Sequence, residues 1–403
     1  MTALPPAAPS PDRPDSLSLA GQAAPIAAIS VVGLSLSMSL PLFALMLERE
    51  GYTGAMIGAS SMATPLAIIL AAPAMPWVMA RLGLARLSAG ATLLAAAVFA
   101  LIPEVEGIAA WTALRFVWGI ATAGLFFTAE FWIVAGAPPR LRGRVIGLYG
   151  LAITAAFAAG PLLLLVTGDE GALPFRTAAV IAILALGPIL YGARLAPDPS
   201  DDGVQAHPAA AFRYARSDPA LLLAVVLFGA IEYGAISLFT AWGLRSGIEA
   251  DMAITLVALF AVGSMVLQVP IGWAADRVEA RRLLLACALA CIAAPLVMVA
   301  SQAVGPTVLA MLVWGGFGAG LYTVALAGLG ARYAGRELAE ASAAVTVAYG
   351  IGAFAAPGLF GLAMDQVAPP HGLMLCGAAA AALYAALVLR RLAVRARPAP
   401  PET

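Results

Sequence analysis

The chain has 403 residues, of which 62% are hydrophobic and only 11% are charged, whereas soluble domains carry about 25% charged residues. Its formal net charge at pH 7 is zero, so nucleic acid is not an implied partner. This balance excludes an ordinary soluble domain and predicts a polytopic α-helical protein embedded in a lipid bilayer.

Apolar runs recur along the chain, and a helix needs about 20 such residues to cross the hydrocarbon of a bilayer. Residues 1–21 are polar and proline-rich, which predicts a disordered tail. Twelve spans are then expected, in chain order, at residues 22–47, 55–79, 87–103, 108–136, 145–167, 173–195, 218–244, 252–273, 283–303, 307–333, 340–364 and 372–392.

The distribution of arginine predicts the orientation of these spans. Twelve spans place both termini on one side, where most loop and tail arginines also fall, whereas the other side holds only Arg49, Arg176 and Arg245. Because loops rich in basic residues stay in the cytoplasm, we expect both termini to be cytoplasmic and the protein to lie in the inner (cell) membrane.

The two halves of the chain look duplicated. A constant offset of 196 residues pairs Trp77 with Trp273 and Arg49 with Arg245, and it aligns "WGIATAGLF" at 118–126 with "WGGFGAGLY" at 314–322. The polar segment 196–217 divides the halves and predicts a cytoplasmic linker between a six-helix bundle at 22–195 and another at 218–392, followed by a cytoplasmic tail at 393–403.

Three motifs carry a resemblance to a known family. The loop "GWAADRVEARR" at 272–282, the run "RFVWGIATAG" at 115–124 and the two six-span halves resemble the major facilitator superfamily, and several longer stretches resemble its YcaD-like group. The resemblance implies two pseudo-symmetric six-helix bundles, with the first, fourth, seventh and tenth spans around a central cavity.

The resemblance also implies a cytoplasmic gate. It places Asp276 near the start of the span at 145–167, beside Arg142 and Arg144, with Arg277, Arg281 and Arg282 holding that side shut. An aspartate favours a helix N-terminus because the helix dipole is positive there. The alternative is that these charges only fix the topology.

The first-half copy of the loop, "PWVMARLGLAR" at 76–86, lacks the aspartate but keeps two arginines. Internal symmetry therefore suggests ion pairs that have changed sides across the gate. Arg81 and Arg86 would face Glu130, Glu337 or Glu340, and a structural role of this kind is favoured for Glu130 over one in transport.

Two charges lie deep within spans and break the internal symmetry, since Glu232 corresponds to Leu36 and Arg115 to Met311. Buried charges cost several kcal/mol and indicate function or a static ion pair. Glu232 is interpreted as a proton carrier or a contact for a cationic substrate group, and Arg115 as a contact for an anionic group or as a residue that sets the acidity of Glu232. Tyr322, Trp118, Trp314 and Tyr233 are the further candidate substrate contacts.

No cofactor or metal is expected. Cys287 and Cys291 lie without a nearby histidine, and the pattern "MPWVM" at 75–79 lacks the partner ligands of a copper site. No nucleotide-binding loop or catalytic constellation is recognised, so the chain is predicted not to be an enzyme.

The sequence therefore predicts a monomeric secondary active transporter that moves a small organic solute by alternating access, with the proton as coupling ion. One alternative is a non-transporting receptor or scaffold on the same fold, and another, within transport, is a proton-driven exporter of drugs or cations. Substrate and direction stay open.

Overall fold

The computed structural model describes residues 19–136, 142–195, 219–301, 303–333 and 335–395, and nearly all of these lie in helices. The predicted linker and most of both tails fall outside this part of the chain. The first half contains α1 (Leu19–Arg49), α2 (Gly54–Ser61), α3 (Ala63–Ala71), η1 (Ala72–Ala74), α4 (Met75–Leu82), α5 (Leu84–Leu101), η2 (Ile102–Glu104), α6 (Ile108–Gly136), α7 (Arg142–Thr167), α8 (Leu173–Gly192) and η3 (Ala193–Leu195).

The second half contains α10 (Pro219–Gly229), the π-helical segment η4 (Ala230–Ala235), α11 (Ile236–Arg245), α12 (Ala250–Ala275), α13 (Ala280–Ala300), α14 (Val304–Gly330), α15 (Gly335–Gln366) and α16 (Gly372–Arg395). Together the described helices form 12 segments that are long and apolar enough to cross a membrane, which confirms the twelve predicted spans. The protein is thus a multi-pass membrane protein.

Local chemistry explains where the observed helices differ from the predicted spans. The ninth and tenth crossings, α13 and α14, begin about three residues before the expected 283 and 307. Pro306 falls in the first turn of α14, where a missing backbone N–H removes no helical hydrogen bond. The second crossing is divided into α2, α3, η1 and α4, and Pro73 and Pro76 lie at the beginning of η1 and α4.

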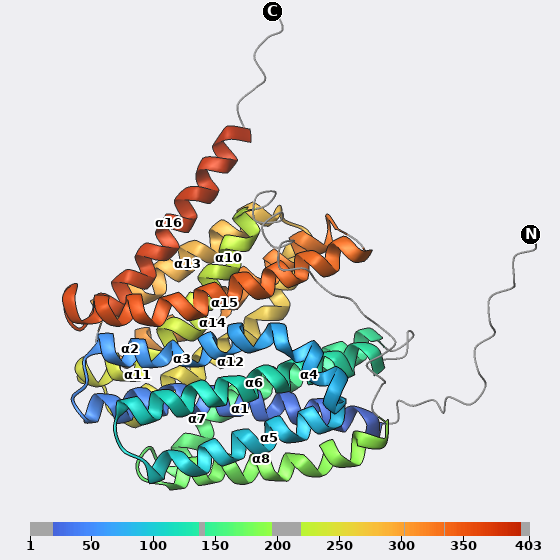
Figure 1. Cartoon of the computed structure of the whole chain (residues 1–403). Coiled ribbons are helices and arrows are strands. Elements are labelled where there is room, and N and C mark those ends of the chain that lie inside the picture. The colour runs from blue at the N-terminus through green and yellow to red at the C-terminus, as the bar shows by residue number, and fades with distance from the viewer. Residues whose placement is uncertain (1–18, 137–141, 196–218, 302, 334, 396–403) are drawn as a thin grey trace, which may run out of the picture.

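The helices form two bundles, one from α1 to α8 and the other from α10 to α16 (Figure 1). Their internal packing repeats the sequence offset. Gly33 on α1 lies against Ile153 on α7, and the equivalent Gly229 lies against Tyr349 on α15. Such glycines allow helix backbones to approach closely. The duplication predicted from the sequence therefore extends to equivalent helix contacts.

The bundles meet at one end of the molecule. We call the end where α1 begins and α16 finishes the terminal end, and the other the distal end. Helix α2 packs against α15, α1 against α11, and α7 against α12, whereas α4, at the terminal end, packs against α5 and α6 of its own bundle. Figure 1 shows the bundles diverging from the distal toward the terminal end.

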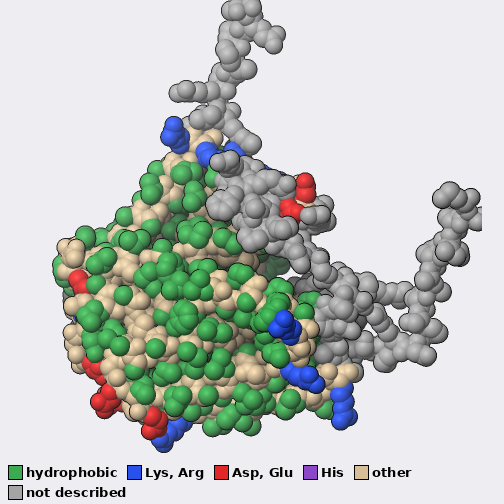
Figure 2. Space-filling view, viewed as in Figure 1, with side chains coloured by type: hydrophobic (Ala, Val, Ile, Leu, Met, Phe, Trp, Pro, Cys, Tyr) green, Lys and Arg blue, Asp and Glu red, His purple; other side chains and the backbone are tan. Residues whose placement is uncertain are grey.

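The outer surface suits a bilayer. Large apolar side chains such as Val166 and Leu383 are 83% and 74% exposed, and Figure 2 shows hydrophobic side chains over most of the visible face, with charged ones near its ends. Exposed apolar surface of this extent requires a lipid environment.

Candidate functional site

Glu232 lies near the middle of the seventh crossing, within the π-helical segment η4 between α10 and α11. The equivalent position, Leu36, lies in the uninterrupted α-helix α1. A π-helical turn widens the helix and is frequent at functional sites. At Glu232, therefore, both the sequence and the backbone conformation differ from the equivalent position in the first half.

The Glu232 carboxylate has one hydrogen-bond partner, the Tyr349 hydroxyl, which donates to Oε2 over 2.9 Å. Glu232 is half-buried, although its neighbours Ile231 and Tyr233 on the same segment are only 0% and 6% exposed. No described arginine lies within ion-pair distance of this carboxylate. The site therefore presents an accessible carboxylate in the middle of a span without a cationic partner.

A group of aromatic rings lies beside this carboxylate. The Phe228 ring centroid lies 5.5 Å from that of Tyr322 and 5.8 Å from that of Tyr349, with interplanar angles of 43° and 50°. These rings come from α10, α14 and α15, and both tyrosines are half-buried. Sequence reasoning identified Tyr322 but missed Phe228 and Tyr349, although Phe228 lies one helical turn before Glu232 and therefore on the same face.

Arg115 is sealed inside the molecule on α6, with 2% of its surface exposed. Its guanidinium carbon lies 4.7 Å from the centroid of the Phe43 ring, and its Nε and Nη1 atoms have no hydrogen-bond partner among the described residues. It lies beside Tyr233, whose hydroxyl donates to the Ser61 carbonyl oxygen over 3.3 Å. The static Arg115–Glu232 ion pair is thus not formed in this structure.

The predicted tryptophan contacts lie within the packed bundles. Trp118 is 2% exposed and forms an edge contact with Phe99, whereas Trp314 is 0% exposed and forms one with Phe260. In this conformation both rings fill core volume and do not border the accessible surface near Glu232.

Glu130 lies on α6 toward the terminal end and is exposed. The structure does not bring Arg81 to it, because the Arg81 guanidinium instead stacks over the Trp77 ring at 4.0 Å. Among the described residues Glu130 has no ion-pair partner, and it lies within electrostatic reach of the Tyr322 hydroxyl. Glu130 is therefore an exposed acid of the first bundle in the neighbourhood of Tyr322 on the second.

At the terminal end, the predicted gate residues Arg277 and Arg282 make local contacts. Arg277 donates to the Trp273 carbonyl oxygen over 3.0 Å, and Arg282 pairs with Glu279 at 3.5 Å within its own segment. The remaining gate candidates are placed as follows: Asp276, Arg86 and Glu337 are exposed, Arg281 and Glu340 are half-buried, and the side chains of Arg142 and Arg144 lie outside the described part of the chain. Because the bundles diverge here, the gate stays a prediction for a conformation closed at the terminal end.

A charged cluster at the distal end joins the two bundles. Arg245 at the end of α11 donates from Nε to Glu48 on α1, from Nη1 to Asp365 on α15, each over 2.8 Å, and from Nη2 to the Tyr52 carbonyl oxygen over 3.1 Å. We call Glu48, Arg245 and Asp365 the distal cluster. It closes the end at which the bundles meet.

Asp365 also caps a helix of the opposite bundle. Its Oδ1 and Oδ2 atoms accept hydrogen bonds from the backbone N–H groups of Gly54 and Ala55, over 2.8 and 2.7 Å, at the start of α2. These are two of the N–H groups that a helix leaves unpaired, and the dipole there favours an anion. The interaction predicted for Asp276 at the terminal end thus has a counterpart at the distal end.

The sequence identified Arg245 only as one of three arginines on the side of the membrane opposite the termini. A signal was available, because the offset of 196 that pairs Arg49 with Arg245 also pairs Asp169 with Asp365. In the first bundle Arg49 binds Asp169 over 2.6 Å without crossing to the other bundle. The second copy of this pair has gained the contacts that span the interface.

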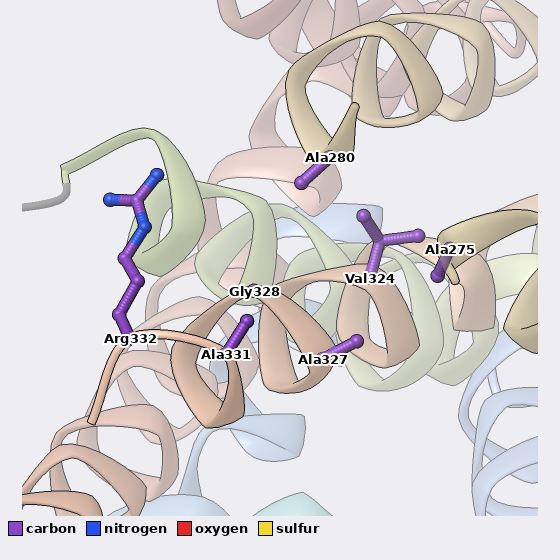
Figure 3. A pocket seen from close by; sticks show the side chains of 7 residues that line it. All are labelled: Ala275, Ala280, Val324, Ala327, Gly328, Ala331 and Arg332. Atoms are coloured by element: carbon purple, nitrogen blue, oxygen red, sulfur yellow. The ribbon is translucent and has the colours of Figure 1, made fainter. Parts of the chain in front are cut away.

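A hollow at the terminal end of the second bundle lies apart from this site (Figure 3). Small aliphatic residues line it, with Arg332 at one edge. Its lining residues belong to the ends of α12 and α13, to α14 and to the two residues that follow it, so all of them come from the second bundle.

The sequence profile of the Major Facilitator Superfamily matches residues 26–255 and 245–403. The chain therefore belongs to this family of membrane transporters, which confirms the predicted family and fold class and the prediction that the protein is not an enzyme. Assignment to the YcaD-like group stays a prediction.

Two relatives carry the same family description. The uncharacterized MFS-type transporter YfkF of Bacillus subtilis (strain 168) is 26% identical over 264 residues, which are 64% of this chain and 66% of YfkF. The uncharacterized MFS-type transporter Ent638_1421 of Enterobacter sp. (strain 638) is 26% identical over 71% of this chain and 73% of its own length.

Solved structures share the fold at low sequence identity. A bacterial homolog of the human lysosomal transporter Spinster, in an inward-facing and unoccupied conformation, has a TM-score of 0.75 and 16% identity, over 96% of this chain and 100% of that one. The nucleoside transporter NupG has a TM-score of 0.74 and 14% identity, over 93% of this chain and 98% of its own.

Proposed function

We propose that the protein is a secondary active transporter that moves a small organic solute across the inner membrane by alternating access, with the proton as coupling ion. Family membership supports transport. Contact between the bundles at the distal end and their divergence at the terminal end support alternating access, because only one end can be open at a time. All groups invoked belong to one chain, so we propose that the monomer is the working unit.

The arginine-rich loops and tails support a cytoplasmic location of the terminal end. With that orientation, the conformation described is open toward the cytoplasm and closed on the outside by the distal cluster. Release of the distal cluster and assembly of the predicted terminal gate would produce the opposite conformation.

The observation that carries the coupling proposal is the half-buried Glu232 in the π-helical segment, hydrogen-bonded to Tyr349. An ionised carboxylate at mid-membrane costs several kcal/mol unless it is paired or hydrated. Proton uptake removes this cost, as does binding of a cationic group. Exchange between these states at Glu232 would couple the movement of solute to that of protons.

Transport is tested by finding a ligand and measuring its flux. A thermal-shift screen of the purified chain against metabolites and drugs reports any binder as an increase in Tm, and the binder is then followed across proteoliposome membranes. We expect at least one binder to cross in a pH-gradient-dependent manner. A tight binder that never crosses would contradict transport and support the receptor alternative.

A further inference from the structure

A carboxylate, Glu232, lies with a group of aromatic rings on the second bundle, and a second carboxylate, Glu130, lies nearby on the first. The Tyr322 hydroxyl lies within electrostatic reach of both carboxylates. Phe228, Tyr322 and Tyr349 contribute the rings. Among the described residues neither carboxylate has a cationic partner within ion-pair distance.

We propose that this cluster binds an organic cation, such as an amine or a quaternary ammonium or phosphonium ion, and that Glu232 exchanges this cation for a proton. The proposal rests on the proposed function and names the substrate class of the same site.

The contacts favour a cation over an anion. Aromatic faces attract cations through their quadrupole, and the attraction grows when water is excluded. Two carboxylates without a counter-ion add the same preference. Arg115, the buried arginine beside Tyr233, is 2% exposed and packed on Phe43, so it offers no accessible contact to an anion in this conformation.

The same contacts favour an organic cation over a metal ion. A hard metal cation requires several oxygen ligands, and the described residues contain no group of three or more side chains that could hold one. The surfaces beside Glu232 are instead rings from three different helices, α10, α14 and α15. Such a lining suits a bulky, partly apolar ion.

The exchange of a proton for an organic cation follows from the single negative charge of the Glu232 carboxylate. Its Oε2 atom accepts from Tyr349, and the titratable or charged groups on the helices around it are Tyr349, Tyr322, Tyr233 and Glu130, with Arg115 beyond Tyr233. A proton and an organic cation both neutralise the Glu232 carboxylate, so they compete for it. Binding of the cation therefore releases the proton, and the two move in opposite directions.

The test uses two probes of nearly identical size and shape and opposite charge, tetraphenylphosphonium and tetraphenylborate. Their binding to the purified full chain is measured by isothermal titration calorimetry in buffers of different ionisation enthalpy, which also counts the protons released. We expect the phosphonium to bind, to release protons and to bind less tightly as the pH falls. The borate is expected not to bind at this site.

Variants locate the site. Glu232→Gln is expected to weaken phosphonium binding by about 10-fold or more and to abolish proton release. Tyr322→Leu removes a ring and is expected to weaken binding by about 3- to 30-fold, the range of cation–π interactions, and more than Tyr322→Phe, which keeps the ring. Glu106→Gln, at an exposed acid of the distal end, is the matched control and leaves binding unchanged.

Failure of phosphonium to bind, equal binding of the borate, or undiminished binding and proton release in Glu232→Gln would each overturn the substrate class. Proton-coupled flux of a neutral or anionic ligand found by the thermal-shift screen would do the same and would leave the proposed transport function intact. The two proposals therefore fail separately.

Discussion

The burial of Arg115 indicates whether this side chain serves stability or function. Its burial leaves Nε and Nη1 without hydrogen-bond partners among the described residues, and its stabilising contacts are the Phe43 ring and the neighbouring Tyr233 side chain. A buried unpaired charge costs several kcal/mol, whereas a cation–π contact returns about 2 kcal/mol. The side chain therefore costs stability in this conformation, as expected for a residue used in another one.

This argument predicts the effect of Arg115→Met, which keeps most of the volume and removes the charge. We expect the Tm of the purified protein to stay the same or rise, while substrate flux in proteoliposomes falls at least 10-fold. A Tm several degrees lower would show that Arg115 stabilises this conformation and would contradict a role reserved for transport.

At the scale of elements, α2, α11 and α15 meet at the distal end and hold the two bundles together in this conformation. Asp365 is bound by Arg245 of its own bundle and caps α2 of the other, so the ion pair and the helix cap act together. The backbones of α2 and α15 also approach each other closely, because Gly58 lies against the Pro357 carbonyl group. Opening the distal end must break all of these contacts.

The substitution Asp365→Asn removes the charge and one acceptor, and we expect it to weaken distal closure by about 1–2 kcal/mol, since the cluster is partly exposed. Modification of Ser61→Cys by a membrane-impermeant thiol reagent from the distal side measures the opening, in a chain whose native cysteines are replaced by alanine. Ser61 is 1% exposed, so faster modification reports separation of the bundles.

The repeat supplies the control for this measurement. Asp169→Asn disrupts the equivalent pair with Arg49, which lies within the first bundle. We expect no change in Ser61→Cys modification there. An equal increase in the modification rate in both variants would mean that any loss of charge at the distal end loosens the protein. It would contradict a specific role for Asp365.

The crossings themselves could be predicted from the sequence, because the bilayer demands long apolar helices and charges accumulate between them. The site could be predicted only in part. Glu232 and Tyr322 were found, but the π-helical segment depends on tertiary packing of α10 and α11 against α15 and has no local sequence signal. The distal cluster was missed because its contacts join residues 197 and 120 positions apart in the chain.

At the scale of the whole molecule, we propose that each end is closed by the same kind of interaction, an aspartate directed at a helix N-terminus. Asp365 performs this role at the distal end in this conformation. Asp276 is exposed here, and we propose that it does so at the terminal end when that end closes. Transport then requires the two devices to be close in free energy, because a ligand shifts the balance only by its differential affinity.

Asp276→Asn and Asp365→Asn should therefore shift the conformational balance in opposite directions. Distances between spin labels at the two ends, measured by double electron–electron resonance, would show more terminal-open protein for Asp276→Asn and more terminal-closed protein for Asp365→Asn. An unchanged distribution for Asp276→Asn would leave its loop as a topology signal only.

The central claim concerns Glu232. Its protonation is proposed to couple solute binding to the change between the terminal-open and terminal-closed conformations. The most direct measurement is ligand-driven proton movement in proteoliposomes, read with a pH-sensitive dye and a ligand from the thermal-shift screen. Proton movement should be lost in Glu232→Gln and retained in Glu106→Gln. Proton movement in Glu232→Gln equal to that of the unmodified protein would contradict the assignment of Glu232 as the coupling group.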